Sequence, residues 1–282
     1  MHRRAWLGLA CLAASCVPRA TTRGPGANFT PADPPVRFEY RPPTNPAHQA
    51  LYAELRDRHV LEQFAEALSV LRLPRTLTLS FAGCDGTSTA WYDPEDATIT
   101  FCYEYLAEIR HEAASRPLGK VPRKEASDGP VVFVMLHETG HAVFDLLQVP
   151  ILGREEDAAD AFATVILLRL GRDVALRTLR GTAWQYAQAA ASRAPDESDF
   201  ADVHGLDAQR YYNILCLAYG SDPETFAGAL KDGQLPAERA EGCEEEYQQA
   251  LYAVHELIAP SIDADAVERL RAKHGSRWET GR

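Results

Sequence analysis

The chain has 282 residues, of which 46% are hydrophobic, and its formal net charge at neutral pH is -11. A chain of this length and apolar content can bury one substantial core. Binding to phosphate requires a basic patch, and the sequence contains none, so we expect no nucleic-acid partner.

The first 16 residues have the pattern of an export signal. A positive segment, His2–Arg4, precedes an apolar run that is too short to anchor the chain across a bilayer. Small residues directly before Cys16 are similar to a bacterial lipoprotein cleavage box, although Ala13 stands where leucine is usual. We expect residues 1–16 to direct the chain to the periplasm or cell envelope. Two alternatives stay open: lipidation of Cys16, which would be the only attachment to a membrane, and free secretion.

Residues 17–46 are rich in Pro, Thr, Gly and Ala without an apolar period, which predicts a flexible tether. From residue 46 to 71, leucines and Phe64 recur at helical spacing, so we expect one or two helices there, ended by Pro74.

The period then changes to that of strands. Thr76–Phe81 and Thr98–Tyr103 alternate, Ala90–Tyr92 lies between them, and turn signals separate the three segments. The pattern predicts a small, antiparallel, three-stranded sheet. A helix is expected over residues 104–115, then a polar loop, and then a second helix that begins near Pro130.

This second helix carries the pattern His-Glu-x-x-His. His137 and His141 are four residues apart, so both imidazoles lie on one helix face and can bind one metal ion. Glu138 lies beside them and can take a proton from a water that the metal activates. The competing explanation is a chance spacing on an amphipathic helix, but the residues around the motif are uncharged, as in a buried site. The other two His-Glu pairs of the chain, at His111 and His255, lack the second histidine.

A zinc ion in a hydrolytic site needs one more protein ligand and an open position. Pro150 and Gly153 end the first helix, and the following acidic segment predicts another helix that returns alongside it. We assign Glu156 as the third ligand of a single Zn²⁺ ion. Asp160, one turn later, is expected to accept the second ring N–H of a ligating histidine, His137. The alternative is that these acids only favour the helix N-terminus, which we expect for Glu155.

The order of sheet, helix, loop and metal-binding helix is that of the zincin architecture. We therefore expect an α+β, mostly helical fold with the sheet packed over the active-site helix. The domain is expected to span residues 47–275, with the sheet and active-site helix in 47–150, a helical half in 151–275, and a tail at 276–282.

Several segments together carry a closer resemblance. They are Ala90–Pro94, Ile99–Glu104, His137–Ala142, Gly153–Asp160 and Gln209–Cys216. With these motifs the chain resembles a bacterial family of exported metallopeptidases, a domain family of unknown function, over about residues 46 to 260. The Glu-x-x-x-Asp arrangement also resembles that of the gluzincin peptidases. The resemblance implies a zinc-dependent, gluzincin-like peptidase and brings no substrate with it.

The helical half contains polar residues that could stabilise the negative charge of a transition state. The candidates in residues 202–212 are His204, Arg210, Tyr211 and Tyr212. His204 is the preferred candidate because we expect it on a loop before a helix. The alternative is structural, because Arg210 can pair with a core carboxylate and the tyrosines can pack.

Four cysteines follow Cys16, which allows three pairings. We expect Cys84 to pair with Cys102 and Cys216 with Cys243, because each pair is near in sequence and within one half of the domain.

These features favour an exported zinc peptidase with a peptide or protein substrate and Glu138 as general base. The alternative is a catalytically silent, zincin-like envelope protein that binds a partner and retains its metal for stability. Oligomeric state and cleavage specificity stay open.

Overall fold

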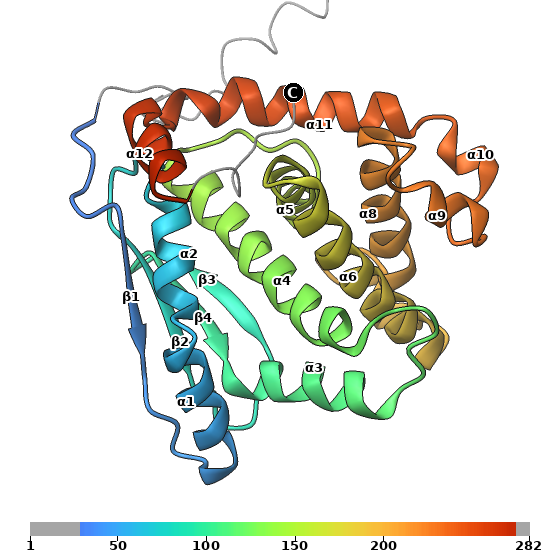
Figure 1. The fold of residues 1–282 in the computed structure, drawn as a ribbon, viewed down its shortest axis with the longest axis horizontal. Helices are drawn as coiled ribbons and strands as arrows, with labels where there is room; N and C mark the ends of the chain where they lie inside the picture. The colour runs from blue at the N-terminus through green and yellow to red at the C-terminus, as the bar shows by residue number, and fades with distance from the viewer. Residues whose placement is uncertain (1–28, 275–282) are drawn as a thin grey trace, which may run out of the picture.

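A computed structural model describes residues 29–274 of the chain (Figure 1). The predicted signal peptide with Cys16 and the predicted tail at 276–282 lie outside the described residues. Residues 29–46, the second part of the predicted tether, are included. None of the described helices is both long and apolar enough to cross a membrane.

The fold is α+β and mostly helical, as predicted, but the sheet has four strands and is mixed. The prediction of three antiparallel strands is therefore wrong in number, and its antiparallel direction is correct only for the pair β3 and β4. In space the strands follow the order β1-β2-β4-β3, with β1 and β4 parallel to β2, and β3 antiparallel to β4. Alternation tells which residues share a face, but strand direction depends on how the strands are connected. The bounds are β1 (Val36–Tyr40), β2 (Leu77–Ala82), β3 (Ala90–Asp93) and β4 (Thr98–Cys102).

Strand β1 lies inside the predicted tether, which corrects that prediction. The chain runs from β1 to the parallel strand β2 through a 3-10 turn and two helices, a crossover of the length that parallel pairing requires. These elements are the turn Pro46–His48, α1 (Gln49–Asp57) and α2 (Val60–Leu68).

The main core packs the sheet against helices from earlier and from later in the chain. Every residue of the central strands β2 and β4 is buried, including their serine and threonines. The same apolar cluster contains Leu61 of α2, Val143 of α4 (Arg123–Leu146) and Phe162 of α5 (Glu155–Arg169). The sheet therefore holds the metal-motif helix from one side through continuous apolar packing.

Helix α4 runs through the middle of the molecule, between the sheet and a group of three helices, which are α5, α6 (Arg172–Ser192) and α8 (Asp207–Ser221) (Figure 1). Helices α5, α6 and α8 lie on its other side, and α11 crosses the ends of α5 and α8. The remaining helices are α3 (Tyr103–Ser115), α6 (Arg172–Ser192), α7 (Glu197–Ala201), α8 (Asp207–Ser221), α9 (Ala227–Lys231), α10 (Ala237–Ala240), α11 (Cys243–Leu257), the turn Ala259–Ser261 and α12 (Ala264–His274).

Helix α4 begins at Arg123 and contains Pro130, so the prediction of a helix that begins near Pro130 is wrong. Tertiary packing explains the longer helix. A Cβ atom on Gly129 would lie 2.6 Å from the carbonyl oxygen of Thr178 in α6, and one on Gly181 would lie 1.9 Å from that of Glu125. The backbones of α4 and α6 thus touch at a glycine pair. Packing at this contact offsets the loss of the helical hydrogen bond that Pro130 cannot donate.

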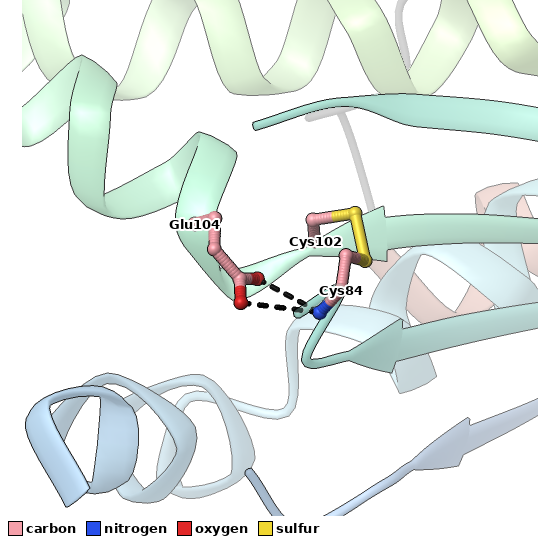
Figure 2. Close-up of side chains that lie close together, drawn as sticks. All are labelled: Cys84, Cys102 and Glu104. Atoms are coloured by element: carbon pink, nitrogen blue, oxygen red, sulfur yellow. Dashed lines mark hydrogen bonds between the residues drawn. A yellow bond between two sulfur atoms is a disulfide. The ribbon is translucent and has the colours of Figure 1, made fainter. Parts of the chain in front are cut away.

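Both predicted disulfides are confirmed: Cys84 pairs with Cys102, and Cys216 with Cys243. Figure 2 shows the first of them beside Glu104, at the start of α3. The Glu104 carboxylate accepts hydrogen bonds from the backbone N–H groups of Cys84, at 3.0 Å, and of Gly86, at 3.3 Å. This corner therefore ties the turn after β2 to the end of β4 both covalently and by hydrogen bonds.

Removal of the second disulfide by the double change Cys216→Ser and Cys243→Ser should lower the free energy of unfolding by about 3 kcal/mol. The bond closes a loop with a sequence separation of 27 residues, and its loss frees the unfolded chain. Urea unfolding of the oxidised wild type and the variant measures the difference. An unchanged midpoint would show that the bridge contributes nothing to stability.

Candidate metal centre

The two motif histidines lie on one face of α4, as their spacing predicts. Their Nε2 atoms are 3.2 Å apart, and the His137 side chain is only 4% exposed. The helix can be buried here because Gly140 lets α5 approach closely: a Cβ atom on Gly140 would lie 3.3 Å from the Cα atom of Ala159. This close crossing brings the acidic first turns of α5 next to the histidines.

Glu156 reaches both histidines from the first turn of α5. Its Oε2 atom lies 3.0 Å from Nε2 of His137 and 3.4 Å from Nε2 of His141. His204, between α7 and α8, approaches the same oxygen, with its Nε2 atom at 3.0 Å. The structure therefore brings together the residues that the sequence predicted as ligands, and it adds His204 to their immediate surroundings.

Each of these histidines has a carboxylate behind its ring. Asp160 lies 2.8 Å from Nδ1 of His137, the position that the sequence predicted for it. When Asp160 holds a proton on Nδ1, the lone pair of His137 is on Nε2, which faces Glu156 and the centre of the site and can bind a cation there.

Two of these carboxylates were missed by sequence reasoning. Glu155 lies 2.7 Å from Nδ1 of His141, although we expected it only to favour the helix N-terminus. Asp202 lies 2.9 Å from Nδ1 of His204 and also accepts the backbone N–H of that residue. The Asp-x-His spacing was the only available signal for Asp202, and nothing in the sequence distinguishes Glu155 from its acidic neighbours.

Arg210 lies behind Asp160 and does not line the metal-site cleft. Its Nε and Nη2 atoms donate to the two Asp160 oxygens at 2.7 Å each, and its guanidinium stacks on the Tyr186 ring at 4.7 Å. Burial on its own would raise the pKa of Asp160, but hydrogen bonds from Arg210 and His137 bring that pKa below its usual value. Arg210 thus keeps Asp160 ionised against His137.

Glu138 lines a cleft of about 430 Å³ together with His141, Glu156 and His204. Edge strand β3 forms another wall of this cleft through Trp91 and Tyr92. Burial raises the pKa of Glu138, while the nearby histidines lower it. A buried carboxylate with a raised pKa is a stronger base than one in water, which suits it to accept a proton in the cleft.

The two tyrosines considered for the site do not line this cleft. Tyr211 packs in a separate apolar cluster with Ala183 and Leu215, and burial raises its pKa to about 12. Tyr212 lines a different cavity, next to Arg154. Of the four residues predicted to stabilise a transition state, all within residues 29–274, His204 is thus the one that lines the metal-site cleft.

The fold and site define a helical α+β protein with a histidine and glutamate cluster at the base of a cleft. The chain belongs to a protein family described as "Putative metallopeptidase", whose sequence profile matches residues 40–258. This membership suggests a bound metal and a peptidase role, and it names neither the ion nor a substrate. No curated protein and no solved structure matches the chain.

Proposed function

We propose that the protein is a zinc-dependent peptidase in which His137, His141 and Glu156 hold one zinc ion. The observation that carries this proposal is the approach of Glu156 Oε2 to both imidazole Nε2 atoms, at 3.0 and 3.4 Å. Two imidazole nitrogens and one carboxylate oxygen form a ligand set of hydrolytic zinc sites, which keep a further position open. The donors of this chain therefore fit the metal that its family implies.

Bound zinc supplies Lewis acidity, which polarises the scissile carbonyl and lowers the pKa of water to about 7. Glu138 accepts a proton from the attacking water as the water oxygen bonds to the carbonyl carbon. The protonated Glu138 then donates this proton to the leaving nitrogen as the carbon–nitrogen bond breaks. One buried carboxyl group thus serves as base and then as acid.

His204 is the residue we propose to stabilise the negative charge that develops on the carbonyl oxygen. Hydrogen bonding to Glu156 raises the pKa of His204, burial opposes this, and Asp202 raises the pKa further. A protonated imidazole held by Asp202 next to the cleft is a suitable donor to an oxyanion. Arg210 acts instead through Asp160, which it orients and keeps charged.

Export is part of the proposal. Two disulfides within the described residues form and persist in oxidising compartments, and they agree with the predicted signal peptide. Cell fractionation should recover the protein outside the cytoplasm. Recovery in the cytoplasm would refute export.

The proposal is tested by zinc quantitation on the purified mature protein, together with cleavage of a broad peptide library. We expect about one zinc ion per chain and hydrolysis that a chelator abolishes. Bound zinc without any cleavage would favour the alternative of a silent binding protein.

Replacement of Glu156 by alanine should abolish stoichiometric zinc binding, because only His137 and His141 would remain as ligands. His255→Ala is the matched control, since His255 is an exposed histidine of α11 that pairs with Glu256 and lies outside the cleft. Zinc content after dialysis measures both. Full zinc occupancy in the Glu156 variant would show that another residue, His204 or a second carboxylate, is the third ligand.

A further inference from the structure

A second cavity adjoins the metal-site cleft at His204, which lines both. It has a volume of about 380 Å³ and lies between the end of α6, helix α7 and the start of α8. His204 Nε2 is 3.0 Å from Glu156 Oε2, so one imidazole ring separates this cavity from the metal ligands. A peptide with its scissile bond at the metal centre would have a neighbouring side chain within reach of this cavity.

The charged groups that line the cavity are paired, with one exception. Asp199 forms a two-bond ion pair with Arg193, and Asp202 holds His204. Arg210 is occupied by Asp160. Within the described part of the chain, no hydrogen-bond or ion-pair partner lies within bonding distance of the Asp207 carboxylate. The cavity thus presents one carboxylate whose charge is available to a ligand.

The Asp207 carboxylate is open to an incoming cation. Asp207 is an exposed residue in the first turn of α8, so a side chain that enters the cavity can reach its carboxylate from solvent. Desolvation raises the pKa of Asp207, and the charges of Arg210 and Arg193 lower it through space. A cation beside Asp207 would form an ion pair of the modest strength that exposed sites allow.

The remaining wall suits a long aliphatic stem. Ala189 and Ala190 of α6, together with Leu206 and Ala208, contribute small or apolar surface to the same cavity. Lysine and arginine side chains pack their methylene groups along such surface while the charged end reaches a carboxylate.

We propose that this cavity binds a lysine or arginine side chain of the peptide substrate next to the scissile bond, with Asp207 as the specificity-determining residue. The inference rests on the proposed peptidase function, because it names the substrate class of the same site.

The test uses zinc-loaded protein and a series of fluorogenic peptides that differ only beside the scissile bond, with lysine, arginine, norleucine or glutamate there. Norleucine keeps the aliphatic stem of lysine and lacks its charge. The wild type should favour lysine over norleucine by about twofold to fivefold in kcat/KM, as expected for an ion pair with an exposed carboxylate. In Asp207→Asn this ratio should fall to about one, and in Asp207→Lys glutamate should become the preferred residue.

Asp196→Asn is the matched control. Asp196 caps α7 and does not line the cavity, and asparagine preserves such a cap. This variant should keep both the wild-type activity and the wild-type ratio. A wild type that prefers norleucine or glutamate, or an Asp207→Asn variant with an unchanged ratio, would overturn the inference.

Calorimetric binding of the same peptides to zinc-loaded Glu138→Gln protein, with and without Asp207→Asn, separates this inference from the proposed function. A lysine preference in binding that depends on Asp207, without cleavage by the wild type, would refute the peptidase and keep the cavity assignment. Cleavage and binding without such dependence would refute the cavity assignment alone.

Discussion

Substitution of Glu138 by glutamine should lower kcat for peptide hydrolysis by about a hundredfold to ten-thousandfold and leave zinc content unchanged. Glutamine has the shape of glutamate but cannot accept the proton of the attacking water. Glu138 is buried and lines the cleft. Asp145 and Glu155 line it too, but Asp145 accepts a hydrogen bond from Tyr92 and Glu155 lies against Nδ1 of His141, so neither is placed to replace Glu138. Steady-state kinetics and metal analysis measure the two quantities on the same preparation.

The control for this prediction is Glu256→Gln, which changes the glutamate of another His-Glu pair, exposed on α11. It should have wild-type kcat. Hydrolysis that persists at the wild-type rate in Glu138→Gln would rule out this residue as general base, even if the zinc site is correct.

Substitution of Arg210 by methionine should have the largest effect on stability, a loss of about 3 to 5 kcal/mol. The change leaves the Asp160 carboxylate, 6% exposed, without its two hydrogen bonds from the guanidinium. Methionine keeps an unbranched stem over Tyr186, so the lost charge dominates the effect. Zinc should bind about tenfold to a hundredfold more weakly, because Asp160 orients His137.

Urea unfolding and competition with a chelator measure these two losses. In Arg210→Met combined with Asp160→Asn, part of the stability should return, since the buried charge is gone. If Arg210 instead contacted the transition state directly, kcat would fall in Arg210→Met while stability and zinc affinity stayed at wild-type values. That outcome would contradict the placement of Arg210 behind Asp160.

The fold was predictable where a periodic pattern covers a whole element. Three of the strands and the helix that carries the metal motif lie where the apolar spacing places them. Strand β1 was missed because prolines at 34, 35, 42 and 43 surround it, and Pro-rich composition is typical of a tether. The start of α4 was missed because Pro130 marks a helix start in isolation, whereas a glycine contact with α6 supports the helix before it.

By itself, the sequence determined that His137 and His141 share a helix face with Glu138 beside them, because a period of 3.6 residues requires it. It also favoured the cysteine pairs that the structure contains, since partners near in sequence and within one half of the domain meet most readily. Only the tertiary structure decided that Glu155 pairs with His141 and Asp202 with His204. The close crossing of α4 and α5 at Gly140 aims Glu156 at the Nε2 atoms and Glu155 at the back of His141. His204, in the segment before α8, and Asp207, the first residue of α8, come to the site from far along the chain, and such packing follows no local period.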